Sequence, residues 1–306
     1  MGGGNWSDDA YKHIKSSYKS MSTDDIFKSN KTGTVAKDMS PKDVKFRECR
    51  DSDAHPMSFG VMVMLDETGS MGSIPEFLIR EKLGTLMESL IAHGINDAQI
   101  LFGAIGDHYS DRCPLQVGQF ESGTDELNKW LSSIYLEQNG GGQNRESYSL
   151  AWLFAARHTS MDCFEKRGQK GILFSIGDEG THPILEADRL RDLMGYSTSE
   201  DITDAAILAE AQRTFHVFHI HIEEGSCGRD SNVIGYWKKA LGERLIMCKD
   251  KTQVAELIAS TVAVIHGIDL ETFTKTFDPK TAIDVKNALA KVTKDVTTNN
   301  GGVVNL

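Results

Sequence analysis

The sequence has 306 residues, of which 40% are hydrophobic and 25% charged, and its formal net charge is −11. A chain of this length can bury the core of one large α/β domain or of two small ones. The acidic balance argues against nucleic acid as the main partner, because neutralising phosphates requires clustered Lys and Arg, and no such cluster stands out.

Two features of the sequence bear on the cellular compartment. The five cysteines are widely spaced and contain no CxxC pair, which predicts reduced thiols and not a disulfide framework or a zinc knuckle. The first residues lack the apolar core of a signal peptide, and no stretch approaches 18 apolar residues. We therefore expect a cytoplasmic protein without a membrane partner.

Residues 1–56 form a polar extension that is rich in Ser, Lys, Asp and Gly. Within it, Tyr11, Ile14, Tyr18 and Met21 follow one another at steps of three and four residues, which predicts a short amphipathic helix. We expect this helix to pack on its own domain in preference to a partner.

The stretch 59–72, FGVMVMLDETGSMG, is the most informative part of the chain. Its unbroken apolar run is typical of a strand buried on both faces of a parallel sheet, and ligands bind at the carboxyl ends of such strands. Asp66, Thr68 and Ser70 alternate after it, so one carboxylate and two hydroxyl oxygens can meet at one point. Such hard oxygen ligands suit Mg²⁺. The alternative is that Thr68 or Ser70 caps a helix beginning near Ile74.

Two other predicted strands also end in polar residues. Residues 99–106 are followed by the run DHYSD, which begins at Asp107, and residues 171–177 are followed by Asp178. The carboxyl ends of parallel strands lie at one edge of a sheet, so we expect both ends to lie near Asp66.

Helices and strands alternate along the rest of the chain. Strand patterns occur at 115–120, 215–222 and 244–248, and helical patterns at 74–93, 125–136, 148–158, 183–194, 201–214, 231–241, 253–265 and 279–294. This alternation predicts an α/β fold with a Rossmann-like, doubly wound, mainly parallel sheet, in which 115–120 is an antiparallel edge strand.

The run Asp66-Glu67-Thr68-Gly69-Ser70 resembles the D-x-S-x-S signature of the von Willebrand factor A (vWA) domain, with Thr in place of the first Ser. The resemblance covers 57–267 and is greatest to intracellular single-domain members of bacteria and their phages. It implies a vWA fold between the N-terminal extension and a C-terminal helical extension and tail at 268–306. It also implies a metal-ion-dependent adhesion site, where Thr68 and Ser70 bind the metal and Asp66 binds it directly or through water.

The resemblance implies further metal ligands from two later segments. Asp178 matches the second site aspartate of the family. Many members supply a Thr from the glycine-rich loop, which here spans 139–147 and contains none. This loop resembles the Pro-Glu-Gly-Gly version of integrin β subunits, so Glu146 takes the ligand role, with Gln143 or Asn144 as the alternative. On the residues alone, Glu146 can instead be a first-turn residue favoured by the helix dipole.

Two other groups of residues suggest competing sites. His216, His219 and His221 suggest zinc, but no Cys or carboxylate spacing completes such a site. Asp107 and His108, together with the aspartates at the other strand ends, suggest a metal-dependent hydrolase with His108 as general base. The sequence contains no nucleophile elbow, P-loop or H-E-x-x-H motif. We therefore expect Asp107 to hold metal-bound water or an outer hydrogen bond.

The expected function is a non-enzymatic, metal-dependent protein-binding module. The ion would be Mg²⁺, or Mn²⁺ in its place. An Asp or Glu carboxylate of a partner protein would complete its coordination shell. The resemblance adds an AAA+ ATPase as a candidate partner. A hydrolase that uses the same acidic cluster, and a scaffold that assembles as a homo-oligomer, are the alternatives.

Overall fold

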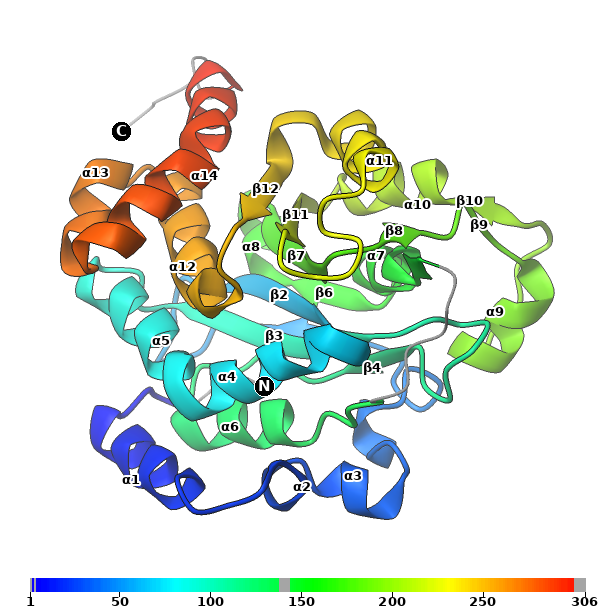
Figure 1. Cartoon of the computed structure of the whole chain (residues 1–306), viewed down its shortest axis with the longest axis horizontal. Coiled ribbons are helices and arrows are strands. Elements are labelled where there is room, and N and C mark those ends of the chain that lie inside the picture. Colours follow the sequence, from blue (N-terminus) through cyan, green and yellow to red (C-terminus); the bar gives the residue numbers. More distant parts are fainter. Residues whose placement is uncertain (1, 3, 138–143, 300–306) are drawn as a thin grey trace.

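The computed structural model describes residue 2, residues 4–137 and residues 144–299, with the side chains of Ser70 and of residues 294–299 outside that description. Its centre is a six-stranded sheet (Figure 1). The strands lie in the order β12 (Leu245–Cys248), β11 (Phe215–Ile222), β7 (Gly171–Gly177), β2 (Phe59–Asp66), β3 (Ala98–Ile105) and β4 (Leu115–Val117). Neighbouring strands are parallel except β3 and β4. The predicted α/β class and mainly parallel sheet are therefore confirmed.

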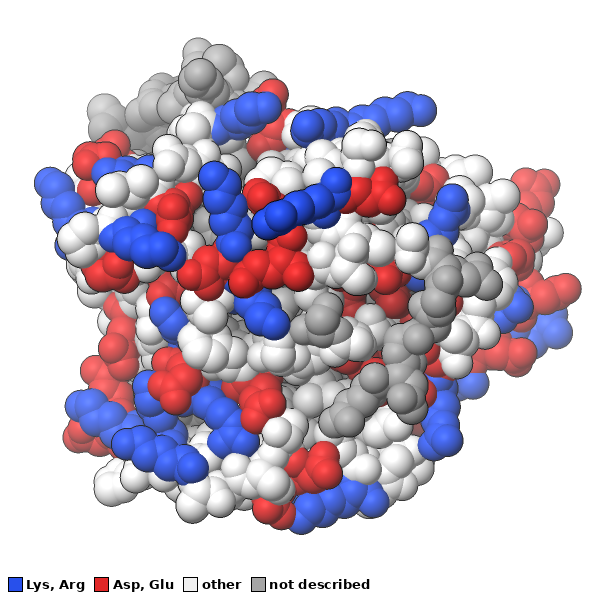
Figure 2. Space-filling model, in the orientation of Figure 1, with Lys and Arg blue, Asp and Glu red and all other residues white. Residues whose placement is uncertain are grey.

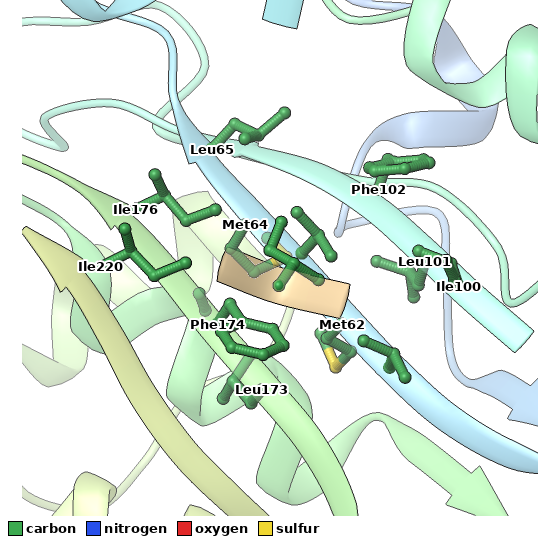
Figure 3. Packing of buried hydrophobic residues seen from close by; sticks show 14 of the residues in the cluster. Met62, Met64, Leu65, Ile100, Leu101, Phe102, Leu173, Phe174, Ile176 and Ile220 are labelled. Carbon is green, nitrogen blue, oxygen red and sulfur yellow. The ribbon is translucent and has the colours of Figure 1, made fainter. Parts of the chain in front are cut away.

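Strand β2 is central because both of its faces are apolar. All eight of its residues are buried, and it pairs with β3 on one side and β7 on the other. Figure 3 shows its side chains Met62, Met64 and Leu65 among those of the two neighbouring strands, which include Phe102 and Phe174. This packing fixes where β2 ends, and therefore where Asp66 lies.

Helices cover both faces of the sheet (Figure 1). One layer contains a single helical run made of α4 (Ser73–Phe77), a π-helical turn (Leu78–Lys82) and α5 (Leu83–Ala92), together with α6 (Thr124–Ser132) and α12 (Val254–Ile265). The opposite layer contains α7 (Tyr148–Arg157), α10 (Asp204–Ala211) and α11 (Ser231–Leu241). None of the helices in the described ranges is long and apolar enough to cross a bilayer.

The N-terminal extension packs on this core. The predicted helix is α1 (Asp8–Tyr18), which is followed by α2 (Thr23–Ile26) and α3 (Lys28–Thr32) and lies beside α6 (Figure 1). Tyr11 and Tyr18 are buried, and the Tyr18 hydroxyl donates to Asn128 Oδ1 of α6 at 2.9 Å. A pairing that the sequence analysis did not predict joins β1 (Arg47–Cys49) to β6 (Thr159–Met161), ahead of α8 (Asp162–Arg167).

Two predicted helices begin later than their sequence pattern suggested. Their first residues form the antiparallel pair β9 (Ile184–Leu185) and β10 (Ile202–Thr203), so the helices are α9 (Ala187–Met194) and α10. Beyond α12, α13 (Leu270–Phe273) precedes α14 (Pro279–Asn299), which packs on α12.

Two of the three histidines of β11, His219 and His221, are core residues. The His219 ring stacks on the Trp237 indole with ring centroids 3.5 Å apart, and His221 Nε2 lies 3.0 Å from the Gly228 carbonyl oxygen. Burial lowers the pKa of both imidazoles. No group of potential metal ligands in the described part of the chain includes them, so the zinc interpretation of this strand is not supported.

Gly177, at the end of β7, allows this strand to approach the end of β2. A Cβ at this position would lie 2.0 Å from the Tyr148 hydroxyl and 2.7 Å from Asp66 Oδ2. We predict that Gly177→Ala lowers the free energy of unfolding by about 1–3 kcal/mol, because the added methyl overpacks a closed interior.

Urea unfolding measures this change. Gly180→Ala is the matched control, because its added Cβ meets nothing within 4 Å. Equal losses of stability in the two variants would contradict the overpacking.

Candidate functional site

The ends of two parallel strands of the central sheet and one short strand outside it bring the predicted site residues together. Asp66 is the last residue of β2, and Asp178 follows β7 directly. Glu146 arrives on the short strand β5 (Arg145–Glu146), which pairs with β8 (Gly180–Thr181) just after Asp178. All three carboxylates are buried, with 1–2% of each residue exposed.

Thr68 connects the first and third of these carboxylates. Its hydroxyl lies 2.7 Å from Asp66 Oδ1 and 3.1 Å from Glu146 Oε1, and its backbone N–H also donates to Asp66 Oδ1 at 3.0 Å. The other oxygen of Asp66 accepts from the Tyr148 hydroxyl at 3.0 Å. Because Thr68 makes no side-chain bond to the following helical turn, the capping alternative is wrong for this residue.

The alternative interpretation of Glu146, as a residue of the first turn of a helix, is wrong. Glu146 belongs to β5 and not to the first turn of α7, which begins at Tyr148. One of its carboxylate oxygens faces Thr68, and the other, Oε2, is buried without a hydrogen-bond partner among the described residues. A buried polar atom without a partner is uncommon in proteins, and a bound water or cation can supply the missing partner.

Asp178 is held by the turn that follows β11. Its Oδ2 accepts from the Cys227 backbone N–H at 2.8 Å and from the Ser226 hydroxyl at 3.3 Å. Of the other predicted ligands, the Ser70 side chain and Gln143 lie outside the described residues. Asn144 is exposed and has a φ of 55°.

The electrostatics of the site are dominated by buried negative charge. In the described ranges, no Lys or Arg forms an ion pair with Asp66, Glu146 or Asp178. Burial raises the pKa of Asp66, and the charge of Asp178 raises it further. Burial raises the pKa of Glu146 to a greater extent, and the charge of Asp66 adds to that rise. Burial, followed by the charge of Asp66, raises the pKa of Glu179 to about 8.

These residues fit a hard divalent cation. They offer carboxylate and hydroxyl oxygens, the ligands that Mg²⁺ and Mn²⁺ prefer. The unpartnered oxygen of Glu146 lies among them, and a second such oxygen, Glu67 Oε1, is buried in the residue next to Asp66. A bound cation would compensate charges that are otherwise costly to bury.

Asp107 and His108, the residues considered for a hydrolase, also lie near the ends of the parallel strands. They contact Ser147 and His182 and form a separate cluster. The side chain of His108 is fully shielded, and its Nδ1 lies 2.7 Å from Ser147 Oγ. Burial lowers the pKa of His108 to about 4. Asp107 contacts His182, which the sequence analysis placed in no site. The only sequence signal for His182 was its position four residues after Asp178.

Comparisons with known proteins leave the family open. No protein-family model matches the sequence, and no curated protein matches it. Among solved structures, the pilus adhesin SpaC from Lactobacillus rhamnosus GG, in an open conformation, is similar with a TM-score of 0.44 and 12% sequence identity. The match covers 83% of this chain and 31% of the adhesin chain. A similarity at this level identifies neither a family nor a function.

Proposed function

We propose that this chain is a vWA-type binding module that holds Mg²⁺ at a metal-ion-dependent adhesion site and binds a partner protein through it. The observation that carries the proposal is the buried, unpartnered Glu146 Oε2 beside Thr68 and Asp66, in a cluster that lacks a Lys or Arg ion pair within the described residues. The parallel sheet with an antiparallel edge strand, and the D-x-T-x-S run at the end of its central strand, also support it.

Each residue has a distinct role in this proposal. Thr68 supplies a neutral hydroxyl ligand, and the sequence pattern assigns the same role to Ser70. Glu146 supplies a charged ligand, while Asp66 and Asp178 complete the shell directly or through water. When bound, the ion supplies a fixed positive charge with a coordination position that a partner carboxylate can take.

The surface fits a protein partner better than a nucleic acid. On the face drawn in Figure 2, Lys and Arg are interspersed with Asp and Glu, and the net charge of the chain is −11. A partner that presents an Asp or Glu to the ion satisfies the proposal. An AAA+ ATPase, suggested by the family resemblance, and a second copy of this chain are the candidates. Catalysis is not proposed, because His108 is shielded and held by Ser147.

We predict that the chelator-treated protein binds one Mg²⁺ per chain and that Mn²⁺ competes for the same site. Asp66→Asn and Glu146→Gln should each weaken Mg²⁺ binding at least about tenfold, since each removes a charged oxygen from the site. Isothermal titration measures both quantities. Asp188→Asn is the control, because this side chain is 99% exposed, and binding that is unchanged in Asp66→Asn would overturn the assignment.

Partner binding is predicted to require the ion. Proteins retained by the immobilised wild-type chain in Mg²⁺ should be released by chelator and absent from the Asp66→Asn chain, whereas Asp188→Asn should retain them. Light scattering with and without chelator tests the homo-oligomer directly. A partner that remains bound in chelator and to Asp66→Asn would show that the contact does not use this site.

The raised pKa of Glu146 predicts a pH-dependent effect of Glu146→Gln in metal-free protein. Because burial raises the folded-state pKa of Glu146 well above the ordinary value for a glutamate, the folded chain keeps this proton to a higher pH than the unfolded chain. The stability that Glu146 contributes is then complete below about pH 4 and falls as pH rises. Glu146→Gln should therefore match the wild type near pH 4.5 and exceed it by roughly 2–4 kcal/mol at pH 8.

Urea unfolding in chelator at several pH values measures the difference in the free energy of unfolding between the two proteins. Both proteins contain the same histidines, so the titration of the histidines cancels in this difference. Saturating Mg²⁺ should reverse its sign at pH 8, because the ion stabilises only the chain that binds it tightly. A difference that does not change with pH would contradict the buried, protonated state of Glu146.

A further inference from the structure

A second cluster of potential metal ligands lies next to the acidic site. Asp107 and His108 follow β3, and His182 follows β8. One ligand atom from each residue lies within 4.8 Å of the others, and all three residues are buried. His182 Nε2 and Asp107 Oδ1 are now hydrogen-bonded at 2.8 Å, and an ion bound between them would replace this hydrogen bond.

The side chain of His108 is fully shielded, and only one of its two ring nitrogens has a hydrogen-bond partner among the described residues. Ser147 Oγ lies 2.7 Å from Nδ1 and also accepts the His108 backbone N–H at 2.8 Å. A proton on Nδ1 that is donated to Ser147 leaves a lone pair on Nε2. This Nε2 has no hydrogen-bond partner among the described residues, although it is buried. Ligand histidines are typically oriented in this way by a hydrogen bond from the other ring nitrogen.

Glu186 offers a fourth ligand atom close to the unpartnered nitrogen of His108. Its Oε2 lies 3.6 Å from His108 Nε2 and is also buried without a hydrogen-bond partner. Arg189 Nε lies 3.9 Å from the same oxygen, in a pair whose side chains are 46% and 36% exposed. Giving up so exposed an ion pair costs little.

From this geometry we propose that His108, His182 and Asp107, with Glu186 as the fourth ligand, bind a second divalent ion of the Zn²⁺ type. Two imidazole nitrogens with carboxylate oxygens are ligands that Zn²⁺ and its transition-metal neighbours accept, whereas Mg²⁺ selects oxygen alone. This assignment does not depend on the Mg²⁺ site, because the two donor sets share no residue.

The histidine cluster is connected to the acidic site through the backbone around Glu146. Ser147, which orients His108, follows Glu146 directly, and the His182 N–H donates to the Glu146 carbonyl oxygen at 3.4 Å. An ion at the His cluster would join the ends of β3 and β8 and so hold the segment that carries Glu146. We assign the second ion this structural role, without a reaction.

Zn²⁺ titration in saturating Mg²⁺ tests the proposal on the full chain. The wild type should bind one Zn²⁺ per chain, and Asp66→Asn should bind it with unchanged affinity. His108→Gln and His182→Gln should each weaken Zn²⁺ binding more than tenfold, while His13→Gln, at an exposed position of α1, should have no effect. Ser147→Ala keeps both imidazoles and should weaken binding about tenfold through the lost orientation.

Co²⁺ in place of Zn²⁺ provides a readout that needs no variant. The wild-type and Asp66→Asn proteins should show the visible absorption of Co²⁺ bound by nitrogen and oxygen in a site of low coordination number. Absence of Zn²⁺ binding in the wild type, or Zn²⁺ binding that is lost in Asp66→Asn but kept in both His variants, would overturn the second site. A wild-type chain that binds Zn²⁺ but no Mg²⁺ would overturn only the proposed function.

Discussion

The Thr68 hydroxyl lies between two carboxylates, those of Asp66 and Glu146, in an interior where the described residues provide neither with a Lys or Arg. Two negative charges so close together in a medium of low dielectric constant cannot both persist unless protons or a cation compensate them. The protein folds its central strands so that these carboxylates converge. The structure therefore depends on whatever balances this charge.

The fold supplies the rigidity that such a site needs. Strand β2 is buried along its whole length between β3 and β7, so Asp66 cannot move away without disturbing the core. Tyr148 is also completely buried and donates to Asp66 from the start of α7. A cluster of like charges is tolerated because a large apolar core, which extends into the N-terminal helix α1, outweighs its cost.

The sequence predicted those features that depend on a local pattern of residues. Buried parallel strands are continuous apolar runs, so β2, β3, β7 and β11 could be located nearly to the residue, and the polar residues at their ends placed Asp66 and Asp178. Glu146 required a family resemblance, since a Glu before a helix has several ordinary uses. His182 was missed because its partner Asp107 is 75 residues away, and the β5–β8 pairing that brings them together involves only two residues in each strand. No periodicity signals so short a pairing.

The adjacency of Glu146 and Ser147 has an evolutionary consequence. Glu146 ends strand β5 and Ser147 begins the turn into α7. The side chain of Glu146 reaches Thr68, and that of Ser147 reaches His108. Sliding this segment by one position against β8 would present the wrong side chain to each cluster, even if no amino acid were replaced. Insertions and deletions next to Arg145 should therefore be selected against as strongly as substitutions, although surface loops of other proteins absorb them readily. Descendants of this sequence should conserve the spacing here before they conserve the residues.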